Sequence, residues 1–187
     1  MNARLQAIGD ALLGSERRLR IRSARCLLAC ALMAYSVGSL TYFVAVGLAE
    51  RGPVLALALL GVGGMLMFYA AIRSGASERL RDPSLTIAQM SFALLVGALA
   101  YTLAGRGRGA VFPIMMVVLM FGLYSLTPRQ VRLMSWLALG LFGAAMALMA
   151  WRDPRVYRPE VEFAHFLVIA IILPAVSMLA GQLGQLR

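Results

Sequence analysis

Six long stretches of this chain contain almost no charged residue, and they constrain its fold more than any other feature. Each is 17 to 24 residues long. About 20 apolar residues in a helix cross the ~30 Å hydrocarbon core of a bilayer, where a helix satisfies its own backbone hydrogen bonds. We therefore expect an all-α polytopic membrane protein with a bundle of six transmembrane helices. The stretches are Cys26–Ala49, Pro53–Ile72, Leu85–Ala104, Ala110–Leu126, Leu133–Trp151 and Phe163–Leu183.

Composition and length leave little room for anything else. The chain has 187 residues, of which 61% are hydrophobic, and its mean hydropathy is +0.80. The connectors between the stretches are too short to hold a water-soluble enzyme domain. We expect two parts, a basic amino-terminal segment over residues 1–25 and a membrane domain over residues 26–187.

The amino-terminal segment has the pattern of a surface-bound helix. Leu5, Ile8, Leu12 and Leu19 recur at roughly helical spacing within residues 2–22. This predicts a short amphipathic helix that lies on the inner membrane surface in contact with lipid headgroups. It is not expected to be a cleaved signal peptide, because the apolar stretch that follows runs for 24 residues.

The basic residues predict the orientation of the chain. All 18 are arginines, and the net charge is +10. They flank the apolar stretches and form no single basic face, so we expect no nucleic-acid partner. With the amino terminus in the cytoplasm, twelve arginines lie inside and six outside, as the positive-inside rule favours. We expect a multi-pass protein of the bacterial inner membrane with both termini in the cytoplasm.

The only histidine lies near the start of the sixth stretch, three residues after a glutamate. His165 and Glu162 share a helix face at this spacing, so they could form an ion pair, respond to protons or bind one metal ion together. A carboxylate that caps the helix beside an interfacial histidine explains the pair equally well. The spacing alone does not separate these alternatives.

The connector before this pair, residues 152–162, is the most polar outer segment. Its arginines and tyrosine could bind an external anion, although a solvated loop without net charge is the simpler explanation. Other polar groups lie within or near the membrane and could contribute to a site for a small-molecule or proton signal. The candidate ligand-binding or sensing residues are His165, Glu162, Tyr157, Arg152, Arg155, Arg158, Gln89 and Tyr101.

One face of the sixth stretch carries small residues and a proline. Ala170, Pro174, Ser177 and Gly181 follow one another at helical spacing. Small side chains let helices approach closely, and a proline in mid-helix favours a kink. We expect this face to pack within the bundle or against a second copy of the chain, and to transmit a signal along the helix.

The sequence lacks the patterns of polar residues that are typical of enzymes and ion-coupled pumps. No stretch has an Asp, Glu or Lys near its midplane, the usual mark of an ion-coupled pump. We find no phosphate-binding loop, paired acidic metal site or nucleophile with a base. Cys26 and Cys30 are one turn apart and have no nearby histidine or third cysteine to complete a metal site. We expect no enzyme activity, cofactor or metal in this chain.

Three short motifs lie at membrane boundaries: Asp82-Pro83-Ser84-Leu85-Thr86, Ser125-Leu126-Thr127-Pro128-Arg129-Gln130, and Val161-Glu162-Phe163-Ala164-His165-Phe166 followed by Leu173-Pro174. With them the chain resembles, over residues 20–187, the amino-terminal multi-span (MASE-type) membrane sensor domain of bacterial GGDEF diguanylate cyclases. The resemblance implies a sensory and dimerisation domain that regulates an attached cytoplasmic cyclase making cyclic di-GMP. It also implies a homodimer. The chain contains no GGDEF motif, so cyclase activity would belong to the attached domain.

Two other functions remain open from the sequence. A small solute or drug transporter would have a polar cavity at the centre of the membrane that opens alternately to each side. A purely structural anchor would form a tightly packed bundle without a cavity.

Overall fold

The computed structural model describes residues 10, 12–14, 16–80 and 82–185, and side-chain surroundings for all of these except 123–125, 176–177 and 179–185. Helices make up nearly all of the described chain, which contains no strand. Two short 3-10 helices, η1 (Ala76–Arg79) and η2 (Gly105–Ala110), lie in connectors. The long helices are α2 (Arg17–Ala45), α3 (Arg51–Arg73), α4 (Thr86–Leu103), α5 (Val111–Ser125), α6 (Pro128–Arg152) and α7 (Pro159–Gln185).

Several of these helices have the length and composition of membrane spans. Within the described residues, α2, α3, α4, α6 and the segment Gly105–Gly122 are long and apolar enough to cross a bilayer. The expectation of a helical membrane protein is confirmed at this level. The sixth predicted stretch falls within α7, which is 27 residues long.

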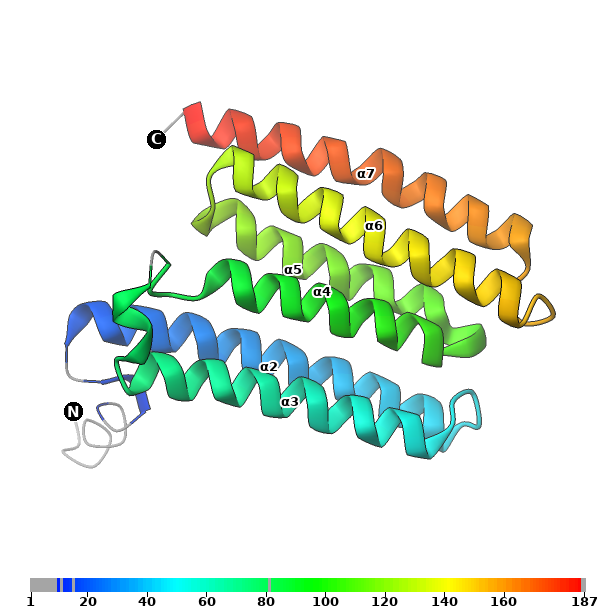
Figure 1. Cartoon of the computed structure of the whole chain (residues 1–187), viewed down its shortest axis with the longest axis horizontal. Coiled ribbons are helices and arrows are strands. Elements are labelled where there is room, and N and C mark those ends of the chain that lie inside the picture. The colour runs from blue at the N-terminus through cyan, green and yellow to red at the C-terminus, as the bar shows by residue number, and fades with distance from the viewer. Residues whose placement is uncertain (1–9, 11, 15, 81, 186–187) are drawn as a thin grey trace.

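The helices run roughly along one direction and are packed side by side (Figure 1). α4 lies in the middle, where it contacts α3, α5 and α6. α2 packs against α3 on one side of the bundle, and α7 packs against α6 on the other. Helices that follow one another in the chain are therefore also neighbours in space.

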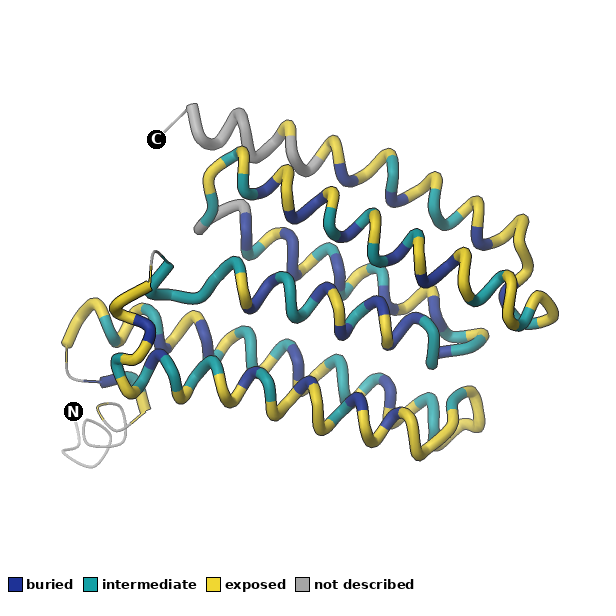
Figure 2. The backbone as a smooth tube through the Cα atoms, viewed as in Figure 1, coloured by how far each residue is buried: buried dark blue, intermediate teal, exposed yellow. Residues whose placement is uncertain are grey.

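Buried residues lie along the sides of the helices that face one another, and exposed residues lie on the outside (Figure 2). Many of the exposed residues are large and apolar. Leu94 of α4 and Phe142 of α6 are fully buried. Met67 of α3 and Ile171 of α7 are 74% and 71% exposed. Large apolar residues exposed in this number suit contact with lipid and would be unfavourable in water.

The starts of α4 and α6 are stabilised by local side-chain hydrogen bonds. The carboxylate of Asp82 accepts hydrogen bonds at 3.1 Å from the backbone N–H groups of Ser84 and Ile87, the latter in the first turn of α4. Thr127 and Gln130 form a capping box at the start of α6. Two of the motifs that resemble the sensor family therefore have a local structural role as helix caps.

The amino-terminal segment differs from the single predicted helix over residues 2–22. Gly14 has a φ of 89°, a left-handed conformation that interrupts a helix, and α2 begins only at Arg17. Leu12 and Leu19 therefore belong to different elements, while Leu5 and Ile8 lie outside the described residues. α2 also runs without a break through the expected domain boundary at residues 25 and 26.

Residues before α2 are held against the end of α3. The Tyr69 hydroxyl donates a hydrogen bond to the carbonyl of Leu12 at 2.6 Å, and Arg73 donates one to the carbonyl of Asp10 at 3.1 Å. The Asp10 carboxylate also pairs with Arg20 at 3.2 Å. We call this end of the bundle, where α2 begins and α7 ends, the proximal end, and the opposite end the distal end.

We expect the substitution Asp82→Ala to lower the free energy of unfolding by about 1 kcal/mol, because it removes an acceptor for free N–H groups in the first turn of α4. Unfolding by sodium dodecyl sulfate in mixed micelles, followed by circular dichroism, measures this. Asp82→Asn keeps an acceptor oxygen and should lose less. Equal losses in the two variants would contradict a capping role.

Candidate functional site

Five polar or ionisable side chains meet at the distal end, between α4, η2, the α6–α7 connector and α7. We call them the distal cluster: Tyr101, Arg108, Tyr157, Glu162 and His165. Tyr101 has no exposed surface, and the exposed fractions of Tyr157, Glu162 and Arg108 are 2%, 3% and 7%. Such deep burial of charge is costly unless each group has a partner.

The Glu162 carboxylate receives a donor at each of its oxygens. Arg108 donates from Nε to Oε1 at 2.7 Å, and the Tyr101 hydroxyl donates to Oε2 at 2.5 Å. The Arg108 contact is also a buried salt bridge. These residues are 54 and 61 positions from Glu162 in the sequence, so the carboxylate connects α7 to both η2 and α4.

His165 extends this network by one hydrogen bond. Its Nδ1 lies 3.0 Å from the Tyr101 hydroxyl oxygen. A hydroxyl has one proton, so when Tyr101 donates it to Glu162, it accepts from an Nδ1–H of His165. The result is a directed chain from His165 through Tyr101 to Glu162. The imidazole packs edge-on against Phe112 with a 5.0 Å distance between ring centroids, which holds the ring in place.

Tyr157 contacts the guanidinium of Arg108 with its ring and the backbone at the end of α4 with its hydroxyl. The Arg108 guanidinium carbon lies 4.7 Å from the centre of the Tyr157 ring, a cation–π contact. The Tyr157 hydroxyl donates to the carbonyl of Thr102 at 2.7 Å and accepts from the N–H of Gly105 at 3.1 Å. Burial raises the pKa of the Tyr157 phenol, which keeps it neutral and able to donate.

Gly105 permits the turn that brings Arg108 inward. Its φ is 51°, in the left-handed region that favours glycine, and an added Cβ would lie 2.9 Å from the carbonyl oxygen of Leu48. The carbonyl of Gly105 accepts a hydrogen bond from Arg108 Nη1 at 3.0 Å. The turn therefore both aims the guanidinium and satisfies one of its donors.

The structure brings together four of the residues singled out in the sequence, Tyr101, Tyr157, Glu162 and His165. It adds Arg108, which the sequence analysis counted only among the outer arginines. A basic residue between two glycines in a short connector was the available signal, but the partner lies 54 residues away, so spacing along the chain could not identify it.

Three arginines expected near this site lie elsewhere. Arg152, Arg155 and Arg158 are exposed, and Arg158 pairs at 3.7 Å with Glu160, which is exposed as well. The connector turns so that Tyr157 points inward and the guanidinium groups stay in contact with solvent, which avoids the cost of burying three cations. This arrangement agrees with the simpler explanation of the connector as a solvated loop, and anion binding by its arginines stays a prediction.

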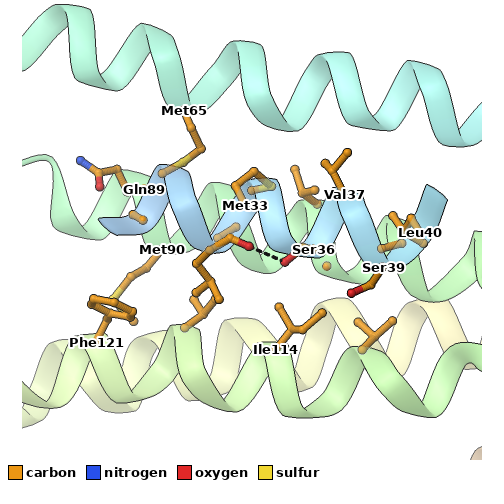
Figure 3. A pocket seen from close by; sticks show the side chains of 18 of the residues that line it. Met33, Ser36, Val37, Ser39, Leu40, Met65, Gln89, Met90, Ile114 and Phe121 are labelled. Atoms are coloured by element: carbon orange, nitrogen blue, oxygen red, sulfur yellow. Dashed lines mark hydrogen bonds between the residues drawn. The ribbon is translucent and has the colours of Figure 1, made fainter. Parts of the chain in front are cut away.

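Gln89 also lies apart from the distal cluster, at the proximal end of α4. Its side-chain nitrogen donates to the carbonyl of Ser84 at 3.0 Å. The side chain borders an elongated apolar cavity of about 290 Å³ between α2, α3, α4 and α5 (Figure 3). The sequence analysis did not predict this cavity, because it arises from the spacing of helices and not from any one motif.

The predicted transmission face is described only in part. Ala170 is half-buried and Pro174 is exposed, and α7 continues as one helix through the proline. Ser177 and Gly181 lie outside the residues whose side chains the structure describes.

The pair Glu162 and His165 does not have the surroundings of a metal site. Arg108 places a fixed positive charge at 2.7 Å from the carboxylate, which opposes a second cation there. Within the part of the chain that the structure describes, no three residues of the types His, Cys, Asp and Glu gather closely enough to hold a metal ion.

Comparison with known proteins adds no assignment: no family model, curated protein or solved structure matches this chain.

We expect Arg108→Met to lower the free energy of unfolding by about 3–5 kcal/mol, because it leaves the buried Glu162 carboxylate without its cation. The double variant Arg108→Met/Glu162→Leu replaces both charges by apolar groups and should recover most of the loss. Unfolding in mixed micelles measures both. A double variant as unstable as the single one would show that charge pairing is not what stabilises this end of the bundle.

Proposed function

We propose that this chain is a membrane-embedded sensory domain of a bacterial signal-transduction protein, and that α7 carries the signal from the distal cluster toward a cytoplasmic output domain. The family resemblance suggests a diguanylate cyclase as that output. The observation that carries the proposal is the Glu162 carboxylate, a buried charge that connects the first turn of α7 to α4 and η2.

The packing of α7 suits a transmitting helix. Its main neighbour is α6, with a smaller contact on α5, and it lies at the edge of the bundle (Figure 1). The hydrogen bond to Tyr101 joins its distal end to α4 as well. Loss of this bond would leave α7 joined to this side of the bundle mainly through the salt bridge to Arg108 of η2, and would loosen its position relative to α4 while it stays packed on α6.

A signal can act here by a change in protonation or by competition for a hydrogen bond. A proton or small molecule shifts the position of α7 only if it binds one arrangement better than the other. Protonation of His165 at Nε2 would add a positive charge beside the buried Glu162–Arg108 pair, and a ligand that competes for the Tyr101 hydroxyl would remove a hydrogen bond of Glu162, so either event discriminates between the two arrangements. Transfer of the signal along α7 would then involve the segment around Pro174, where the backbone lacks one hydrogen bond.

The proposed topology places six helices across the bacterial inner membrane, with the proximal end in the cytoplasm. Arginines near the start of α2 and the end of α3 favour this orientation. The distal cluster then lies at the periplasmic boundary, where an external signal can reach it. Membrane lipid covers the exposed apolar faces. The family resemblance suggests a homodimer, since GGDEF domains act in pairs.

We expect reporter fusions before residue 17 and after residue 187 to show cytoplasmic locations, because the arginine-rich start of α2 resists translocation. Alkaline phosphatase fusions, active only in the periplasm, should be inactive at both points and active when inserted in the α6–α7 connector. An active fusion at either end would reverse the assignment of the distal cluster to the periplasm.

We expect Tyr101→Phe to change the activity of an attached cyclase by about tenfold, because it removes a charge-assisted hydrogen bond between α4 and α7. The direction shows which arrangement of α7 is active. Cellular cyclic di-GMP at matched protein abundance is the readout, in the chain joined to a GGDEF domain at its carboxyl terminus.

Glu160→Gln is the matched control for Glu162→Gln in the same fusion. Both residues lie in the first turn of α7, but Glu160 is exposed and pairs only with Arg158 at 3.7 Å. Glu162→Gln should alter cyclase output and Glu160→Gln should not. Unchanged output in both Glu162→Gln and Tyr101→Phe would refute the role of the distal cluster in signalling.

The apolar cavity favours a transporter as the second candidate function over a purely structural anchor. A transporter with this cavity would carry a lipophilic compound, because few polar groups line the space. Uptake assays with reconstituted vesicles distinguish it from a sensor.

A further inference from the structure

The elongated cavity between α2 and α5 has the form of a site for a single acyl chain. Its lining follows α2 from Arg25 to Phe43, positions 18 residues apart and so separated by about 27 Å of helix. α4 also lines the cavity, and Ile114 and Phe121 of α5 border it on the side opposite α2 (Figure 3). The lining continues to Val111 of α5 and Ala110 of η2. The volume of about 290 Å³ lies at the small end of the ~300–1,000 Å³ typical of ligand pockets, so the space suits a slender ligand.

Most of the lining is apolar and belongs to the part of the bundle that would lie in the membrane. Met33 and Leu40 of α2 and Val96 of α4 are buried core residues that border it. Ile114 of α5 faces them in the view of Figure 3. A lining of this kind binds a hydrocarbon chain by dispersion contacts and offers few partners to a polar solute.

Polar groups gather at the proximal end of the cavity. Arg25 lies there on α2, and Ser84, Thr86 and Gln89 border the same end from the start of α4. Arg25 is exposed, and no carboxylate in the described part of the chain pairs with it. Farther along α2, Ser36 and Ser39 also border the cavity, but their hydroxyls donate to backbone carbonyls of the same helix. The cavity therefore has a cation at one end and mostly apolar walls along the rest.

A cation at one end of a mostly apolar cavity favours an amphiphile with one negative charge and one acyl chain. A guanidinium binds a carboxylate through two parallel hydrogen bonds. Arg25 directly precedes the predicted first span, at the depth where the carboxylate of a membrane-dissolved fatty acid lies. A cavity of about 290 Å³ favours one chain over the two of a phospholipid.

We propose that the cavity is a binding site for one long-chain fatty acid, with its carboxylate at Arg25 and its acyl chain between α2 and α5. The inference rests on the cavity and on Arg25, and it does not depend on signalling through the distal cluster. In the proposed orientation the fatty acid enters from the cytoplasmic leaflet.

Photolabelling of the full chain in phosphatidylcholine nanodiscs tests this site. The labelling reagent is palmitic acid with a diazirine near the end of its chain. Labelling should be saturable and should map by mass spectrometry to peptides of α2 and α5. Unlabelled palmitate should abolish it, while hexadecanol, which has the same chain without the charge, should compete about tenfold less well.

Two pairs of variants test separately the charge of Arg25 and the space inside the cavity. Arg25→Gln should weaken labelling about tenfold, whereas Arg18→Gln removes an exposed arginine of the same helix outside the cavity and should leave it unchanged. Ala29→Phe places a ring in the cavity and should abolish labelling. Ala31→Phe places the same ring on the exposed face of α2 and should not.

Several outcomes would overturn the proposal. Labelling that does not saturate, or that maps to α6 and α7, would show general contact with lipid. Equal competition by hexadecanol, or full labelling of Arg25→Gln, would show that the ligand's carboxylate does not bind at Arg25. Competition by dipalmitoyl phosphatidylglycerol as strong as that by palmitate would assign the cavity to a phospholipid. Circular dichroism of each variant confirms that it is folded, and the hexadecanol comparison needs no variant.

Discussion

The distal end of this bundle depends on the burial of one carboxylate. A charge that is withdrawn from water and not paired is too costly to persist, so Glu162 requires both Arg108 and Tyr101 in place. Each of these has its own requirements. Arg108 is oriented by the left-handed turn at Gly105 and by the cation–π contact of its guanidinium with the ring of Tyr157. The conformation of two connectors thus follows from the solvation of a single side chain.

A buried polar contact of this kind is especially important for the relative positions of helices in a membrane. Apolar helices gain little hydrophobic free energy from contact with each other when lipid is the alternative, so polar contacts contribute much of what fixes one helix relative to the next. α7 shows this most clearly. Its apolar surface packs closely on α6, where the Phe166 ring lies against Gly143, and the hydrogen bonds of Glu162 fix its position relative to α4 and η2.

The sequence predicts the positions of the helices better than the contacts between side chains that are distant in the chain. Uncharged runs locate the long helices, and the spacing of Glu162 and His165 identifies two of the cluster residues, because both signals are local. Arg108 escaped prediction because its partner is distant in the chain. Arg152, Arg155 and Arg158 were misplaced because the direction in which a loop turns its side chains is set by tertiary contacts, here the burial of Tyr157. The cavity depends on helix spacing and has no sequence signal of its own.

The two sites meet on α4. Ala100 borders the cavity, and the next residue, Tyr101, is the centre of the distal cluster. An occupant that separates α2 from α5 also bears on the helix that presents the Tyr101 hydroxyl to Glu162. If it binds better to one position of α4, it biases the cluster, and a signal at the cluster must change the affinity of the cavity by the same factor. α4 packs against α3, α5 and α6 at once, so a shift of this helix at the cavity would also move the Tyr101 hydroxyl relative to Glu162.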